Sequence, residues 1–264
     1  MLSYPSSMQV SNRALMVLAD ALRHRRTILG SRWRRLSAGR QALLVLAHLR
    51  KGETYTALAG GFGVGTTTVY RYVREGLDVL AAAAPTLDQA LDVARRKAFV
   101  ILDGTLLVID RVGMATGRDR AFYSGKHKRH GVNVQVLADP VGRLIWASPA
   151  LPGARHDMGA AHEHGIVDAL AQAGIQAVAD TAYQGGGPAI AVPQRRRRLD
   201  ADTGHYRRLS RNQKQVNAAH ARQRGPGERA NAQLKSWAVL RRIRSCPSRA
   251  TELVKAVQAL ILTG

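Results

Sequence analysis

The stretch Ala98-Phe99-Val100-Ile101-Leu102-Asp103 places a carboxylate directly after a continuous apolar run. The run is too short for a helix, and its composition is typical of a buried strand. Gly104-Thr105 predicts a turn or bulge, and Leu106–Ile109 is a second apolar run. We therefore expect Asp103 at the end of a core strand, where sheets flanked by helices bind their ligands.

The residues that follow predict a mixed sheet. Val132–Ala138 alternates apolar and polar side chains, which indicates a half-buried strand, and Arg143–Ser148 returns as its hairpin partner. Asp157–Gly174 has a helical pattern, and Ile175–Ala179 is a strand that ends in Asp180. The predicted fold class is α/β, with a mixed sheet and flanking helices.

Residues 1–97 have helical periodicity instead. We expect helices over Arg40–Arg50, over Glu53–Phe62 and from Gly65 to Ala84, followed by a connecting helix or linker over Pro85–Lys97. These patterns predict two domains, an all-α region over residues 1–92 and an α/β domain over residues 93–264.

The second and third of these helices, joined by a glycine-containing turn, have the order of a helix-turn-helix. The short side chains of Thr66 and Thr67 would let the third helix enter a major groove, with Tyr70 at its edge. Arg71 and Arg74 lie on the same face and can reach phosphates or guanine edges. The alternative is a plain three-helix bundle whose outer faces are basic.

The charge distribution also points to a polyanionic partner. The chain has 264 residues and a formal charge of +22. Residues 1–97 carry 15 basic and 6 acidic side chains, residues 98–194 carry 8 of each, and residues 195–249 carry 16 and 3. Two basic segments around a neutral one favour nucleic acid as the partner. The alternative is a solvated, arginine-rich surface.

Composition excludes several other classes of protein. The single cysteine excludes a disulfide framework and a multi-cysteine zinc site. No apolar run is long enough to span a membrane, and the first residues lack the order of a signal peptide. We expect a soluble, cytoplasmic protein.

A third acid stands out in the basic tail. Glu228 is the only acidic residue between Asp202 and Glu252, and it begins a run with helical propensity. Glu228, Asn231 and Lys235 would share one face of that helix.

Three carboxylates from two strand ends and a facing helix suit hard divalent cations. We expect Asp103, Asp180 and Glu228 to hold Mg²⁺ or Mn²⁺, with two ions supporting phosphoryl transfer. Each acid also has an ordinary explanation. An aspartate after a strand is often a turn former or helix cap, and a glutamate in a first helical turn favours the helix dipole.

Five motifs together resemble the transposases of IS5-type insertion sequences, within the DDE superfamily of endonucleases. They are residues 101–105 (ILDGT), 123–131 (YSGKHKRHG), 152–157 (PGARHD), 179–185 (ADTAYQG) and 228–237 (ERANAQLKSW). The resemblance covers residues 30–262. Thr181 departs from it, because relatives often carry Lys after the second aspartate.

The resemblance implies an RNase H-like core with Asp103, Asp180 and Glu228 as its metal-binding acids. It also implies a helix-turn-helix that recognises terminal inverted repeats, and a homo-oligomer on DNA in the bacterial nucleoid. The implied activity is cleavage at transposon ends followed by strand transfer into target DNA. The alternatives are a catalytically silent DNA-binding protein and a metal-dependent endonuclease without strand transfer.

Further side chains are candidates for contact with DNA. Lys126, Lys128 and Arg129 lie between predicted strands and can hold phosphates, as can Asn231 and Lys235 on the predicted helix. The remaining candidates are His127, His130, His156, the loop from Tyr183 through Gly187, and Arg195–Arg198. The alternatives are surface or packing roles for the histidines, an ordinary loop, and a solvated arginine stretch. Asp157 is a rival acid, and we interpret it as a helix N-cap. Trp237 and Ile243 are predicted to be core residues.

Overall fold

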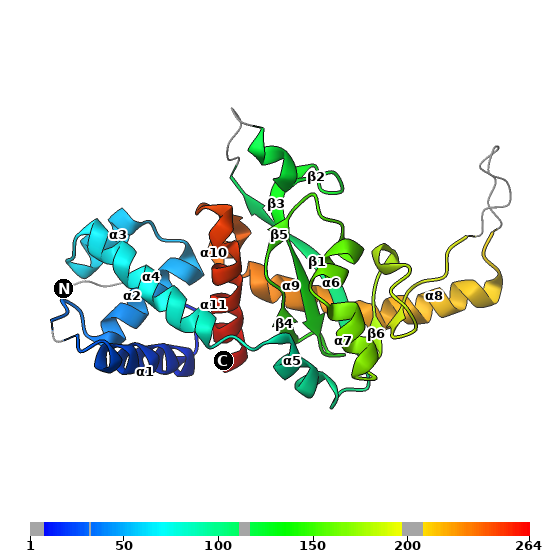
Figure 1. Cartoon of the computed structure of the whole chain (residues 1–264), viewed down its shortest axis with the longest axis horizontal. Helices are drawn as coiled ribbons and strands as arrows, with labels where there is room; N and C mark the ends of the chain where they lie inside the picture. The colour runs from blue at the N-terminus through cyan, green and yellow to red at the C-terminus, as the bar shows by residue number, and fades with distance from the viewer. Residues whose placement is uncertain (1–7, 32, 111–116, 197–207) are drawn as a thin grey trace.

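The computed structural model describes residues 8–31, 33–110, 117–196 and 208–264. Figure 1 shows a group of helices at the N-terminal end of the molecule and a sheet with its own helices beside it. The red C-terminal helices lie between the two parts, and helix α8 extends away from the sheet. No helix in the described ranges is long and apolar enough to cross a membrane.

The N-terminal helices are capped by their own sequence. They are α1 (Asn12–Ile28), α2 (Ala38–Lys51), α3 (Tyr55–Phe62), α4 (Thr66–Ala82) and α5 (Leu87–Ala94). Side chains of Ser11, Ser37, Thr54 and Thr86 accept hydrogen bonds from the first turns of α1, α2, α3 and α5. The helices predicted over α2, α3 and α4 are confirmed, and α5 occupies the predicted connection.

Helix α4 presents the face that the sequence predicted. Val69, Val73 and Leu80 are buried in the core. Thr66, Thr67 and Arg71 are exposed, and Tyr70 is 41% exposed. Arg74 is half-buried, with one guanidinium nitrogen, Nη1, buried and unpaired within the described residues.

The sheet is mixed, as predicted. Its order is β2-β3-β1-β6-β7, with β4 and β5 pairing with β3 and β8 pairing with β1. The strands are β1 (Val100–Ile109), β2 (Tyr123–Ser124), β3 (Arg129–Ala138), β4 (Leu144–Ala147), β5 (Leu151–Pro152), β6 (Ala177–Val178), β7 (Ile190–Ala191) and β8 (Arg242–Ile243). Strand β1 is antiparallel to β3 and parallel to β6. The predicted α/β, RNase H-like fold with a preceding helical region is confirmed.

The predicted turn at Gly104-Thr105 is wrong, because β1 runs without interruption through both residues. Strand β3 pairs with it from Ile101 to Val108, so the backbone of Gly104 stays within the ladder opposite Gln135. Asp103 therefore lies in the middle of a strand rather than at its end.

Two other predictions about the middle segment are corrected. Strand β3 is buried on both faces rather than half-buried, because α6 lies against it on one side and α9 on the other. The helix predicted over Asp157–Gly174 is two helices, α6 (Asp157–Glu163) and α7 (Ile166–Gln172). Gly165, with φ of 67°, separates them in a left-handed conformation.

The basic tail folds into further helices. They are α8 (Arg211–Arg224), which the sequence analysis did not predict, α9 (Gly227–Lys235), α10 (Ala238–Arg241) and α11 (Ala250–Thr263). Short 3₁₀ helices cover Arg118–Phe122, Thr181–Tyr183 and Pro247–Arg249. Helix α11 packs against α4 and β4, so one apolar core joins the helical region to one face of the sheet. The domain boundary at residue 92 stays a prediction.

Close packing seats α9 on β1. A Cβ atom on Gly227 would lie 2.7 Å from Cγ2 of Ile101, so only glycine allows this approach. The turn between β3 and β4 packs closely against the start of the same helix. A Cβ atom on Gly142 would lie 2.0 Å from the carbonyl oxygen of Pro226. Gln233 Oε1 also accepts a hydrogen bond from the backbone N–H of Leu144 at 3.2 Å.

We predict that Gly142→Ala destabilises the protein more than Gly174→Ala does. Both glycines have positive φ, 84° and 65°, but nothing lies within 4 Å of a Cβ at Gly174. The difference in the free energy of unfolding, measured by urea denaturation, should be about 1–3 kcal/mol, the usual cost of overpacking. Equal losses would contradict the close contact between the hairpin and α9.

Candidate active site

One cavity of about 540 Å³ brings together most of the predicted site residues. Asp103, Asp180, Glu228, Asn231 and Lys235 line it from β1, from the end of β6 and from α9. Lys126, His127 and Arg129 line it from the β2–β3 turn, and Arg224 lines it from α8. The cavity thus combines three carboxylates with several basic side chains.

Strand pairing brings the two aspartates together. In the parallel pair of β1 and β6, Val100 is opposite Ala177 and Ile101 is opposite Val178. Asp103 and Asp180 each lie two residues beyond the second of these pairs. Because side chains alternate along a strand, equal spacing places both carboxylates at the same level of neighbouring strands.

Asp103 is held by neighbours on both sides. Its Oδ2 accepts a hydrogen bond from Nδ2 of Asn231 at 2.9 Å, and its Oδ1 accepts one from the backbone N–H of Gly104 at 3.0 Å. Burial raises the pKa of Asp103 to about 6, and the charges of Glu228 and Asp180 add to this rise. Arg224 and the Gly104 N–H act in the opposite direction.

Glu228 is the most exposed of the three acids. Its side chain is 68% exposed, and it lies 3.7 Å from Nη1 of Arg224. Among the residues that the structure describes, no three His, Cys, Asp or Glu side chains stand close enough to ligate one ion as they are placed. A three-carboxylate site therefore requires the Glu228 side chain to turn from Arg224 toward Asp103.

The donor set nevertheless fits a hard divalent cation. Asn231 is buried, and its amide oxygen makes no hydrogen bond within the described residues, while its amide nitrogen is committed to Asp103. An unpaired buried oxygen is costly, so this atom is available to accept a cation or a donor. Carboxylate and amide oxygens are the ligands that Mg²⁺ and Mn²⁺ prefer.

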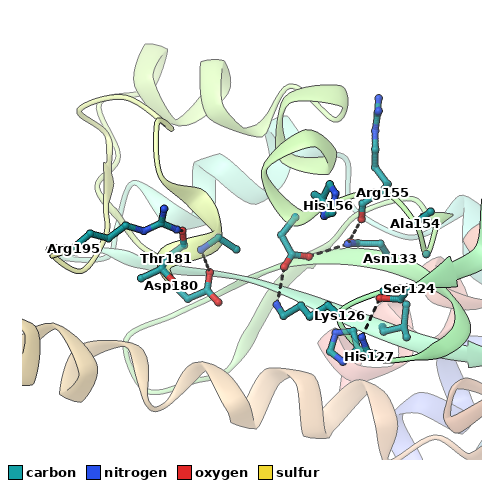
Figure 2. A pocket seen from close by; sticks show the side chains of 15 residues that line it. Ser124, Lys126, His127, Asn133, Ala154, Arg155, His156, Asp180, Thr181 and Arg195 are labelled. Atoms are coloured by element: carbon teal, nitrogen blue, oxygen red, sulfur yellow. Dashed lines mark hydrogen bonds and ion pairs between the residues drawn. The ribbon is translucent and has the colours of Figure 1, made fainter. Parts of the chain in front are cut away.

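Asp157 lies in a second cavity, of about 340 Å³, that shares Asp180, Lys126 and His127 with the first. Figure 2 shows these three shared side chains around the second cavity. The N-cap interpretation of Asp157 is wrong, because His156 is the N-cap of α6 and Asp157 is its first residue. The Asp157 carboxylate instead accepts hydrogen bonds from Nδ2 of Asn133 at 2.8 Å and Nζ of Lys126 at 3.1 Å.

This arrangement depends on Gly104. A Cβ atom there would lie 2.2 Å from Oδ1 of Asp157, so any other residue would displace the carboxylate. Burial lowers the pKa of Lys126, but Asp157, Asp180 and Asp103 outweigh it, and the net shift is upward. Lys126 therefore stays protonated between the aspartates. Sequence reasoning missed this pairing, and it also missed Arg224.

Comparison with known proteins agrees with this geometry. Residues 102–261 match the family model described as DDE superfamily endonuclease, and residues 34–86 match the helix-turn-helix of the same superfamily. The chain belongs to the DDE superfamily of endonucleases. A protein from Streptomyces albus G, described as a candidate transposase for insertion sequence element IS112, is 30% identical over 203 residues. That match covers 76% of this chain and 70% of the relative. No solved structure matches the chain significantly.

Several other residues singled out in the sequence lie outside the two cavities of this endonuclease. The prediction that Tyr183 approaches DNA is wrong, because its side chain is fully buried and its hydroxyl donates to Gln135 Oε1 at 2.5 Å. Lys128 is exposed on the β2–β3 turn and lines neither cavity. Nε2 of His130 lies 3.4 Å from Oδ2 of Asp119. The predicted burial of Trp237 and Ile243 is confirmed.

The predicted phosphate-binding stretch Arg195–Arg198 is described only in part. Nη2 of Arg195 donates to the carbonyl of Thr181 at 2.7 Å, and Arg195 lines the second cavity with His156. Arg197 and Arg198 lie outside the described residues.

We predict that Asp103→Asn stabilises the metal-free protein above pH 6. The folded state raises the pKa of Asp103 from 3.8 to about 6, so the wild type loses stability as pH rises through this window. The variant has no such loss, and it should gain about 1–3 kcal/mol at pH 7.5 and nothing near pH 4.

Thermal unfolding in EDTA across this pH range measures the gain. Added Mg²⁺ should stabilise the wild type more than the variant, because the ion binds only the folded ligand set. A stability difference that does not change with pH would contradict the raised pKa.

Proposed function

We propose that this chain is the transposase of an IS5-type insertion sequence, which cuts DNA at the ends of its element and joins them to target DNA. The observation that carries the proposal is the convergence of Asp103, Asp180 and Glu228 on one cavity lined by basic side chains. The five sequence motifs support the IS5-type assignment, and membership of an endonuclease superfamily supports DNA cleavage.

We further propose that Asp103, Asp180 and Glu228 hold two Mg²⁺ or Mn²⁺ ions. The amide oxygen of Asn231 is an additional ligand on the same helix face. When bound, such ions activate an attacking oxygen and stabilise the leaving oxygen of a phosphodiester. The same site would serve water in the cutting step and a 3′-hydroxyl in the joining step.

The chain's own cations would position the DNA. Lys126, Arg129 and Lys235 line the cavity and can each bind a phosphate oxygen, with His127 beside them. Nη1 of Arg224 lies 3.7 Å from Oε1 of Glu228. We propose that a DNA phosphate binds Arg224 in place of Glu228. The freed Glu228 side chain then turns toward Asp103. Lys128 would contact DNA outside the cavity.

Helix α4 would read the terminal inverted repeats. Thr66, Thr67 and Arg71 are exposed along its outer face, and Tyr70 and Arg74 border them. In this proposal residues 1–92 form the DNA-reading domain and residues 93–264 the catalytic domain. Two copies of the chain would pair two DNA ends in the bacterial cytoplasm, where the nucleoid lies.

We predict that Asp103→Asn, Asp180→Asn and Glu228→Gln each lower Mg²⁺-dependent cleavage by at least about a hundredfold. The loss of a direct ligand should exceed the effect of losing its supporting groups, which is roughly 10–100-fold. Cleavage of labelled duplex that carries the element's end measures the rate, and a gel-shift assay should show that binding of the duplex is retained.

Asp168→Asn is a matched control, because Asp168 is an exposed carboxylate on α7 outside both cavities. It should cleave like the wild type. Full activity of any of the three site variants would remove that residue from the metal site. Pre-cut ends incubated with target DNA should give joined products, whereas hydrolysis alone would favour an endonuclease without strand transfer.

We also predict that Thr67→Ala with Arg71→Ala weakens binding to the element's end more than binding to random duplex. Loss of a good base contact costs about 1–3 kcal/mol of discrimination. Titration of both duplexes at one salt concentration measures the difference. An equal loss on the two duplexes would reassign this face of α4 to phosphate contact.

A further inference from the structure

A third cavity lies between the N-terminal helices and the C-terminal part of the chain, and none of the three acids lines it. Its volume is about 790 Å³. We call it the basic groove, and it is lined by His48, Lys51, Gly52, Glu53, Thr54, Tyr55, Tyr70, Leu77, Ala238, Val239, Arg241, Arg242, Arg244, Ser245, Cys246, Arg249 and Leu253. One wall thus comes from helices α2 to α4 and the other from α10 through the start of α11.

The groove has a large excess of positive charge. Its lining includes one lysine and four arginines, against the single carboxylate of Glu53. Arg242 is paired with Asp110 at 2.6 Å, but neither Arg241 nor Arg244 has an ion pair or side-chain hydrogen bond among the described residues. Burial and the charge of Arg241 lower the pKa of the neighbouring Arg50. Uncompensated cations in a cavity favour a polyanion.

The polar groups of the two walls meet across the groove. Nη2 of Arg249, before α11, donates to the hydroxyl of Tyr70 on α4 at 3.4 Å. The rings of Tyr55 and Tyr70 contact each other edge to face, with centroids 6.0 Å apart. Because these rings pack on one another, their hydroxyls are better placed to bond phosphates than their faces are to stack on bases.

The groove adjoins both of the DNA contacts in the proposed function. Tyr70 precedes Arg71 on the outer face of α4. At the other end, β8 pairs with β1 so that Arg242 in the groove lies opposite Val108, which lines the catalytic cavity. Val108 is five residues beyond Asp103 on the same strand, a distance of about 17 Å. This distance corresponds to about five nucleotides of one DNA strand.

We propose that the basic groove binds the phosphate backbone of the duplex between the site read by α4 and the site that is cut. The groove would set the number of base pairs between recognition and cleavage, because its walls join α4 to the end of β1. This inference rests on the proposed function, since it takes DNA as the substrate.

The natural cysteine provides a direct test. Cys246 is the only cysteine in the chain, it is exposed and it lines the groove. A saturating 40-base-pair duplex, without divalent metal, should slow its alkylation by a maleimide at least about tenfold, and high salt should restore the rate because it releases phosphate contacts. In a matched control, Cys246→Ser with Gln172→Cys on α7, the same duplex should leave alkylation nearly unchanged.

Substitutions provide an independent measurement. Arg241→Gln, Arg244→Gln and Arg249→Gln together should weaken duplex binding about 10–100-fold and reduce the slope of log K against log salt by about 2–3, for three lost phosphate contacts. The control removes three exposed arginines elsewhere, Arg13, Arg95 and Arg96, each replaced by Gln. It should change the slope by less than about 1.

The outcomes separate this inference from the proposed function. The groove proposal would be wrong if DNA did not protect Cys246 and the two triple variants had equal salt slopes. If the protein still bound and cleaved end-containing DNA, the proposed transposase function would be unaffected. Failure of the wild type to bind any duplex would overturn both. Protection of Cys246 with normal binding, in a protein that does not cleave, would support the groove alone.

Discussion

The fold holds like charges close together. Asp103 and Asp180 are kept at one level by backbone pairing of β1 with β6, and Glu228 is brought near them by the packing of Gly227 against Ile101. Burial raises the pKa of Asp103 to about 6, and the nearby charges of Glu228 and Asp180 add to this rise. The rest of the site is arranged around this repulsion, which a divalent cation would remove.

Basic side chains surround the acids but do not neutralise them all. Lys126 is bound to Asp157, and Arg224 lies against Glu228, so two of the cations near the acids already have a partner. Asn231 donates to Asp103, and its own amide oxygen makes no hydrogen bond in the part of the chain that the structure describes. In the proposed function, a divalent cation would bind between the acids and a DNA phosphate would bind beside the basic side chains.

An apolar core and the contacts of one arginine join the helical region to the sheet domain. Helix α11, at the C-terminal end, packs on α4, and the buried core is continuous from the helical region to one face of the sheet. Arg50 on α2 donates to Ser236 Oγ at 2.6 Å and lies over the ring of Trp237, just after α9. Helices α4 and α9 are therefore connected through α2 and α11.

Local pattern alone determined much of this protein. Helical periodicity and the glycines that end α2 and α3 predicted α2, α3 and α4, and the isolated acid in a basic tail singled out Glu228. These signals depend only on neighbours in the chain. Tertiary structure decided the rest. Pairing with β3 made the predicted turn at Gly104 part of a continuous strand, and cover on both faces of β3 buried Asn133 and Gln135. Asp157 joined Lys126 and Asn133, and the basic groove formed between segments about 190 residues apart, because such contacts depend on how distant elements pack.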